Sequence, residues 1–176
     1  MNHDVCYLLV YIYDILLTSN NSTLIQHLIT LLSSEFKLHD LGNAYYFLGV
    51  EVIPISIGLM LSQHKYVLDI LCRAGMSSCK HVDTPAFVSK VDLSSCVLFS
   101  DPIHFRQIIS ALQYLTFIEP DICYVINKVC QFMHALTKSH WVIVKRILRY
   151  LKVTSSFSLH LTRGSSLSLH RFTDAD

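Results

Sequence analysis

Asp14 is the residue whose position in this sequence most needs a chemical explanation. It lies alone within a run of Val, Ile, Leu and Tyr residues that extends from Val5 to Thr18. A carboxylate in apolar surroundings is costly unless it is paired or holds a metal ion. The length and β-branched content of the run favour strands over a helix. A tight hairpin with Asp14 near its tip would return this carboxylate to solvent.

Basic side chains are concentrated in the second half of the chain. Residues 122–171 contain eight Lys or Arg and no Asp or Glu. Four of these cations are spaced seven, four and three residues apart, which places them on one stripe of a helix. They are Lys138, Lys145, Arg149 and Lys152, and Arg146 flanks the stripe. Two interpretations are open: an ordinary solvated helix face, or a face that contacts the backbone of a nucleic acid.

The six cysteines and ten histidines do not form a familiar metal-binding pattern. No two cysteines have the C-x-x-C spacing, and no histidines form H-E-x-x-H. Cys123 and Cys130 lie seven residues apart and would share one helix face. We interpret the cysteines as buried reduced thiols of an intracellular protein.

The elements that must position these groups alternate between helix and strand in the first half. The prediction is a helix over 22–35, strands over 45–54 and 59–61 joined by a turn at 56–58, and a helix over 63–74. Asn21 or Ser22 can cap the first helix, Ser62 the second, and Gly75 is a natural residue to end it.

The second half is predicted to be mainly helical. Residues 76–103 are rich in Ser and Pro, which is typical of a linker or long loop. Helices are expected over 104–118, 120–134 and 138–152, with Pro120 at a first helical turn. Two short strands are expected within 157–173. The fold class is therefore α+β.

Composition excludes several classes of protein. The chain of 176 residues is 52% hydrophobic and 15% charged, against about 25% charged in a typical soluble domain. It is therefore neither a disordered chain nor a coiled coil. The longest apolar run, Val5 to Tyr13, is far shorter than the roughly 20 residues of a membrane span. No basic segment of a secretory signal begins the sequence, so we expect an intracellular protein with no membrane partner.

Seven blocks of sequence, in this order, carry a resemblance to a known family. They are YIYDILLT at 11–18, FKLHDLGNAYYFLGVEV at 36–52, GLMLSQHKY at 58–66, RQIISALQYLT at 106–116, PDICYVINKVCQFMHA at 120–135, VKRILRYLK at 144–152 and FTDAD at 172–176. The chain resembles the C-terminal part of copia-type retrotransposon reverse transcriptases. It is also similar to short plant reading frames of this kind, some described as uncharacterised mitochondrial proteins, so mitochondrial or nuclear encoding is expected.

The resemblance implies a division of the chain into four parts. Residues 1–62 would form a partial palm with a degenerate metal-site hairpin and a primer-grip-like hairpin. Residues 63–103 would be a helix and loop linker, and residues 104–156 a helical region like the thumb and connection. Residues 157–176 would be the truncated start of an RNase H-like domain.

The same resemblance gives Asp14 a role. Family members carry aromatic-x-Asp-Asp at the tip of a palm hairpin, and these carboxylates, with one from an upstream strand, hold two Mg²⁺ ions. Here Tyr13 stands where the first Asp is expected. A phenol, with an ordinary pKa of about 10, is a poor ligand for Mg²⁺. We therefore expect Asp14 to be a vestigial catalytic residue with no Mg²⁺ bound, and the upstream carboxylate and the fingers to be absent from this chain.

Three further groups of residues receive roles by resemblance. The primer grip would be formed by Tyr46, Phe47, Leu48 and Gly49, although a strand of the hydrophobic core fits these residues equally well. Asp174 and Asp176 would be vestigial metal ligands of the RNase H-like part. Contact with an RNA–DNA hybrid or duplex would fall to Lys145, Arg146, Arg149 and Lys152.

Other positions depart from the family pattern. Glu119 stands where the family has Arg, and Ser110 stands where it has Gly. Such changes are typical of relaxed selection. The sequence thus predicts a catalytically inactive RNA-directed DNA polymerase fragment that could retain nucleic-acid binding. The alternative is a co-opted nucleic-acid-binding module without polymerase chemistry.

Overall fold

The computed structural model describes residues 3–87 and 97–164 of the chain. The chain divides into two compact units, Met1–Leu48 and Gly49–Asp176. Both units contain helix and strand, which confirms the predicted α+β class. The first unit ends at Leu48, whereas the sequence placed its first boundary after residue 62. The names palm, linker and thumb for these parts stay predictions.

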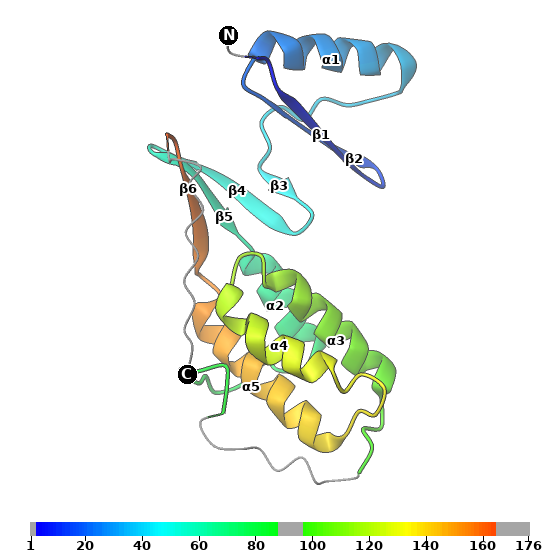
Figure 1. Ribbon diagram of the computed structural model, residues 1–176, viewed down its shortest axis with the longest axis vertical. Helices are drawn as coiled ribbons and strands as arrows, with labels where there is room; N and C mark the ends of the chain where they lie inside the picture. The colour runs from blue at the N-terminus through cyan, green and yellow to red at the C-terminus, as the bar shows by residue number, and fades with distance from the viewer. Residues whose placement is uncertain (1–2, 88–96, 165–176) are drawn as a thin grey trace. The chain divides into compact units, whose positions relative to one another are not determined.

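The first unit consists of a β-hairpin, a helix and a short strand (Figure 1). Its elements are β1 (Cys6–Tyr11), β2 (Asp14–Ser19), α1 (Ser22–Glu35) and β3 (Tyr46–Phe47). β1 and β2 pair antiparallel, as predicted. Asn21 caps α1, because its side-chain oxygen accepts hydrogen bonds from the backbone N–H groups of Thr23 and Leu24.

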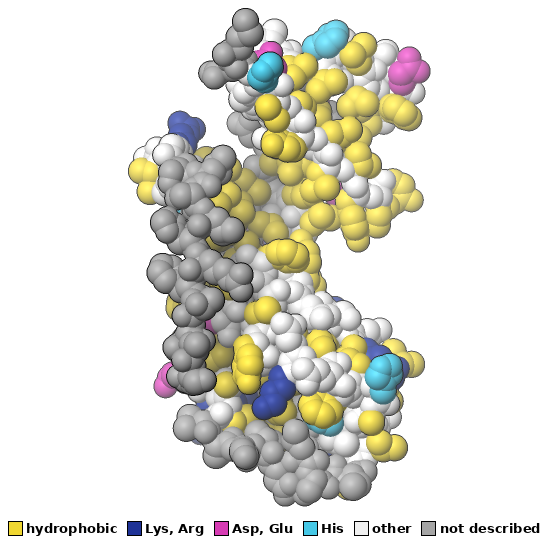
Figure 2. All heavy atoms as spheres, viewed as in Figure 1, with side chains coloured by type: hydrophobic (Ala, Val, Ile, Leu, Met, Phe, Trp, Pro, Cys, Tyr) yellow, Lys and Arg dark blue, Asp and Glu magenta, His cyan; other side chains and the backbone are white. Residues whose placement is uncertain are grey.

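The first unit exposes much of its apolar surface. Tyr7 on β1 is 69% exposed and Ile12 is 72% exposed. α1 contains no fully buried residue. Figure 2 shows hydrophobic side chains gathered on the visible face of this unit. The buried core, and the stability that burial provides, therefore lie in the second unit.

Three strands of the second unit belong to one antiparallel sheet. They are β4 (Val50–Ile55), β5 (Gly58–Ser62) and β6 (Ser158–Thr162), with β5 paired to both neighbours. A Cβ at Gly58 would lie 1.9 Å from the carbonyl oxygen of Leu161, so the close approach of β6 requires glycine there. The predicted turn between β4 and β5 is confirmed.

β6 lies in the segment that was expected to begin an RNase H-like domain. Ser158–Thr162 pairs with β5 as part of the second unit, and the RNase H-like assignment of residues 157–176 stays a prediction. The pairing forms because residues 158–162 reach the free edge of β5 directly after the last helix. The remainder of that segment, including Asp174 and Asp176, lies outside the described residues.

Helices form the rest of the second unit (Figure 1). They are α2 (His64–Arg73), α3 (Pro102–Leu115), the short 3-10 helix η1 (Pro120–Ile122), α4 (Cys123–Cys130) and α5 (Lys138–Thr154). α4 ends four residues before its predicted end. After Cys130 the α-helical pattern gives way to 3-10-type turns, because Phe132 and Met133 donate backbone hydrogen bonds to residues three positions earlier. Gly75 follows α2 with a φ of 66°, as predicted for the residue that ends this helix.

The core lies among α2, α3, α4 and α5. Its fully buried side chains include Ile70 from α2, Leu112 from α3, Ile126 from α4 and Leu148 from α5. α2 is the helix expected in the helix and loop linker of residues 63–103, and it packs in this core with less than 3% of each of its three inner residues exposed. Among the described residues, no helix is both long and apolar enough to cross a membrane.

Candidate functional site

The tip of the β1–β2 hairpin carries the candidate metal-binding residue. Tyr11 pairs with Asp14, so Ile12 and Tyr13 form a two-residue turn between them. Ile12 has a φ of 52°, a left-handed conformation that is uncommon for a β-branched residue. Tyr13 is 96% exposed and Asp14 is also exposed. The predicted return of Asp14 to solvent at a hairpin tip is confirmed.

The residues around Asp14 do not fit a two-metal site. Asp14 is the one acidic residue within β1, β2 and their turn. Within residues 3–87 and 97–164, no three His, Cys, Asp or Glu side chains lie close enough together to hold a metal ion. A hard cation such as Mg²⁺ requires several oxygen ligands, usually with more than one carboxylate or phosphate. The one carboxylate of this hairpin therefore does not by itself form a two-metal site.

A second turn connects β3 to β4. Leu48 and Gly49 both have left-handed backbone, with φ values of 50° and 79°. This pair of dihedrals is typical of the tight turn that joins two antiparallel strands. Tyr46 is 46% exposed, and Gly49 lies near the ring of Tyr66, whose Cδ2 would be 3.5 Å from a Cβ at this position. This turn divides the strand that was expected over 45–54, because Leu48 and Gly49 are left-handed, and the primer-grip role of these residues stays a prediction.

The basic helix α5 is positioned by an N-terminal capping box. The Thr137 hydroxyl oxygen accepts a hydrogen bond from the His140 backbone N–H, and His140 Nδ1 accepts one from the Thr137 backbone N–H. One face of the helix is buried through Val144, Ile147 and Leu151. The cations therefore lie on the outer side of α5, as the spacing predicted.

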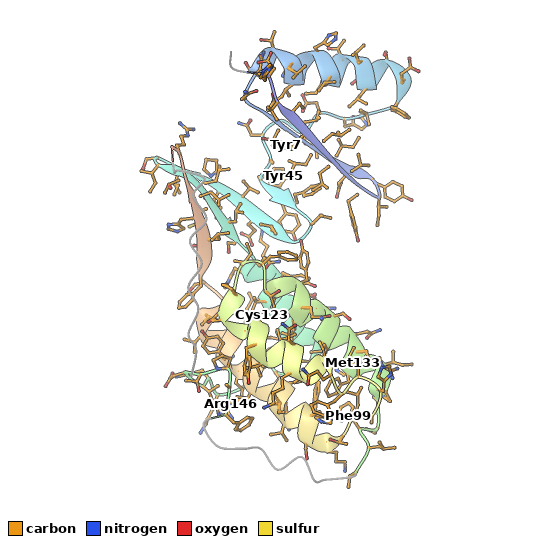
Figure 3. All side chains as sticks on the ribbon, viewed as in Figure 1. Tyr7, Tyr45, Phe99, Cys123, Met133 and Arg146 are labelled. Carbon is orange, nitrogen blue, oxygen red and sulfur yellow. The ribbon has the colours of Figure 1, made fainter. Side chains whose placement is uncertain are left out.

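The side chain of Arg146, labelled in Figure 3, donates hydrogen bonds to a neighbouring loop. Its Nε donates to the carbonyl oxygens of Thr84 and Ala86 at 3.1 and 2.9 Å, and its terminal nitrogen donates to Thr84 Oγ1 at 2.7 Å. The guanidinium carbon lies 4.6 Å from the ring centre of Phe87, a cation–π contact. We call residues 77–87 the strap.

Two further cations hold the same strap. Arg149 Nε donates to the Lys80 carbonyl at 2.7 Å, and the Lys152 ammonium donates to the Ser77 carbonyl. Three of the four residues assigned to nucleic-acid contact are thus half-buried and have a structural role. The spacing of the cations left two interpretations open, a solvated helix face or a face that contacts nucleic acid. Neither interpretation predicted the hydrogen bonds between these cations and the strap. Contact with nucleic acid stays a prediction.

Other cations on these helices remain open to solvent. Lys128 on α4 and Lys138 and Lys145 on α5 are all exposed. None of their three ammonium groups has a hydrogen-bond or ion-pair partner within the described part of the chain. Tyr124, on the same helix as Lys128, is 73% exposed. Exposed cations beside an aromatic ring can contact the phosphates and bases of a nucleic acid.

An acidic cluster at the start of η1 was missed by sequence reasoning. Glu119 is 4% exposed, and one of its carboxylate oxygens accepts a hydrogen bond of 2.6 Å from the Thr154 hydroxyl. Burial, reinforced by nearby Asp121 and opposed by the Thr154 hydrogen bond, raises the pKa of Glu119 to about 7. Tyr150 donates to Asp121, and burial together with this hydrogen bond raises the pKa of Tyr150 to about 12. The one sequence signal was Glu119 standing where the family has Arg.

Comparison with known proteins identifies the family. Residues 3–88 match a family model described as reverse transcriptase (RNA-dependent DNA polymerase). An uncharacterized mitochondrial protein of Arabidopsis thaliana is 45% identical over 170 residues, which cover 97% of this chain and 71% of that protein. The Pol polyprotein from transposon RE1 of the same plant is 44% identical over 98% of this chain. This chain belongs to the copia-type reverse transcriptase family.

The relationship covers a small part of the full polyproteins. The chain spans 12% of the length of the RE1 polyprotein, and 13% of the related polyprotein from transposon TNT 1-94 of Nicotiana tabacum, which is 34% identical. The search of solved structures found no match. The reverse-transcriptase match includes the β1–β2 hairpin and the strap, and it ends before α3. These matches therefore do not establish the polymerase activity of the family for this chain.

Proposed function

We propose that this chain is a retroelement-derived reverse transcriptase segment that does not catalyse DNA synthesis. The observation that carries the proposal is the β1–β2 turn, where Tyr13 is 96% exposed at the position of the family's first Asp. A phenol is a poor ligand for Mg²⁺ at a position where a reverse transcriptase uses a carboxylate. Asp14 by itself supplies one carboxylate, which is too little negative charge to hold two divalent ions.

A primer-extension assay tests the loss of polymerase activity. We expect the purified chain to incorporate no nucleotide on an RNA template with a DNA primer, in either Mg²⁺ or Mn²⁺. A parallel measurement of Mn²⁺ affinity, by paramagnetic resonance, examines the hairpin itself. Tyr13→Asp should raise this affinity on the order of tenfold, because a second carboxylate joins Asp14.

Tyr7→Asp is the matched control for the metal measurement. Tyr7 lies on the same strand and is 69% exposed, but it pairs with Thr18, away from Asp14. The control should leave the affinity for Mn²⁺ close to that of the unchanged chain. Template-dependent incorporation by the unchanged chain would refute the proposal.

Retained nucleic-acid binding is the second candidate function. Its support is the stretch of eight cations without an acid over residues 122–171, together with the exposed Lys128 and Lys145. Such a surface attracts the phosphate backbone and binds it in a salt-dependent manner. This candidate corresponds to a co-opted binding module that no longer needs polymerase chemistry.

Fluorescence anisotropy with a labelled RNA–DNA hybrid tests this second function. We expect the binding constant to fall linearly with salt on logarithmic axes. The double variant Lys128→Ala/Lys145→Ala should reduce the slope by about 2, since each lost phosphate contact contributes roughly 0.9. Lys37→Ala, an exposed lysine in the first unit, serves as the control. A folded chain that shows no binding at low salt would eliminate this function.

A further inference from the structure

The strap runs along α5 in the opposite direction to the helix. Its first carbonyl, from Ser77, is held by Lys152, its middle carbonyls by Arg149, and its last by Arg146. The cations are thus bonded in register, one after another, over residues 77–86. The strap covers the donor groups of these three side chains and competes with any ligand for them.

The bonds between strap and helix engage some of the N–H donors of these side chains without neutralising their charge. Every acceptor is a backbone carbonyl or the hydroxyl of Thr84, and all of these are neutral. No carboxylate within residues 3–87 and 97–164 forms an ion pair with Arg146, Arg149 or Lys152. Asp83 belongs to the strap but makes no ion pair in this part of the chain. The face beneath the strap therefore keeps three positive charges.

The middle of the strap is attached more weakly than its ends. Met76, before the strap, and Ala86 and Phe87, at its end, pack against the hydrophobic core. The intervening segment has no helix or strand, and its polar residues are exposed. A segment with few buried contacts opens at low cost in free energy. Residues 78–84 can therefore leave α5 while Met76, Ala86 and Phe87 stay packed against the core, and this movement frees Arg149 and the donors of Arg146 that Thr84 holds.

We propose that the strap is an autoinhibitory cover over a phosphate-binding face of α5, and that a nucleic-acid backbone displaces it. The proposal rests on the nucleic-acid binding proposed above and adds how that binding is regulated. A phosphate offers an acceptor and an opposite charge together, and arginine binds it in a bidentate manner. A carbonyl offers the acceptor alone. Phosphates therefore replace the strap carbonyls at Arg146 and Arg149.

Loosening the strap without removing a cation tests this gating. Thr84→Val deletes one acceptor of Arg146, and Phe87→Leu removes the cation–π contact while keeping an apolar side chain. The double variant should bind a labelled RNA–DNA hybrid more tightly, on the order of tenfold, because a larger fraction of the chain is open. Thr30→Val/Phe117→Leu makes the same chemical changes at exposed residues that are not part of the strap, and it should leave the affinity unchanged. If the double variant does not fold, Thr84→Val alone replaces it.

Cleavage after Lys80 by a lysine-specific protease reports on the strap directly. The protease must engage the Lys80 carbonyl, which Arg149 holds in the closed state. We expect the hybrid to accelerate this cleavage in the unchanged chain, as the strap is released. Slower or unaltered cleavage in the presence of bound hybrid would overturn the gating proposal.

The outcomes separate the strap from the binding function. Hybrid binding that responds to Lys128→Ala/Lys145→Ala but is unaltered by loosening the strap overturns the gating alone. Tighter hybrid binding by the loosened variant than by the unchanged chain supports the gating. No binding by either chain at low salt overturns the gating and the proposed binding together.

Discussion

Replacing Phe105 with alanine is expected to lower the free energy of unfolding by about 3–5 kcal/mol. The Phe105 side chain is fully buried on α3. Its ring lies 5.5 Å from that of Phe99 and 5.4 Å from that of Trp141. Removal of the ring leaves a cavity at the point where α3, α5 and the segment before α3 meet, and the rigid neighbours fill it poorly.

Denaturation by urea measures this effect. The single tryptophan, Trp141, belongs to the same cluster, so its fluorescence reports on unfolding of the second unit. Circular dichroism should give the same midpoint if the transition is cooperative. Phe117→Ala is the control, because Phe117 is 76% exposed and should cost about 0.5 kcal/mol or less. Equal losses for the two variants would show that Phe105 is not part of a packed core.

Replacing Glu119 with glutamine is expected to stabilise the chain at pH 8 by up to about 3 kcal/mol, and to have little effect at pH 4. Burial raises the pKa of Glu119 from 4.5 to about 7 in the folded chain. The unfolded chain therefore loses its proton at a lower pH than the folded chain does. Stability falls as pH rises from 4.5 to 7 and stays lower above that range. Glutamine is neutral throughout and avoids this loss.

Urea denaturation of both chains between pH 4 and pH 8 measures the difference. His140 also contributes to the pH dependence, since burial lowers its pKa below 6.5 and stability is lost as the pH falls below that value. Both chains carry His140, so its contribution cancels in the comparison. Glu35→Gln changes an exposed glutamate and should alter stability by about 0.5 kcal/mol or less at any pH. A pH-independent effect of Glu119→Gln would show that the carboxylate is not buried.

Local features of the fold could be predicted because neighbouring residues determine them. The β1–β2 hairpin follows from a β-branched apolar run interrupted by one acid, and Asn21 caps α1 as its short polar side chain allows. Gly75 ends α2 because it tolerates left-handed backbone. The order of elements and the α+β class follow from the same short-range rules.

Three features escaped prediction because distant segments create them. β6 pairs with β5, although nearly one hundred residues separate the two strands in the sequence. The strap binds Arg146 and Arg149 through backbone carbonyls, which every residue type provides and no sequence pattern reveals. The burial of Glu119 depends on the packing of Thr154 against it. Contacts of this kind are formed by tertiary packing and have no local signature.

The sequence by itself determined the family, the replacement of a metal-binding Asp by Tyr13, and the stripe of cations on α5. These are properties of residue type and spacing, and folding does not change them. The tertiary structure decided which cations remain open to solvent. Arg146, Arg149 and Lys152 donate hydrogen bonds to the strap, about seventy residues earlier in the chain, whereas Lys128 and Lys145 are exposed. A cation can bind one set of acceptors at a time, so its availability depends on which segments the fold brings beside it.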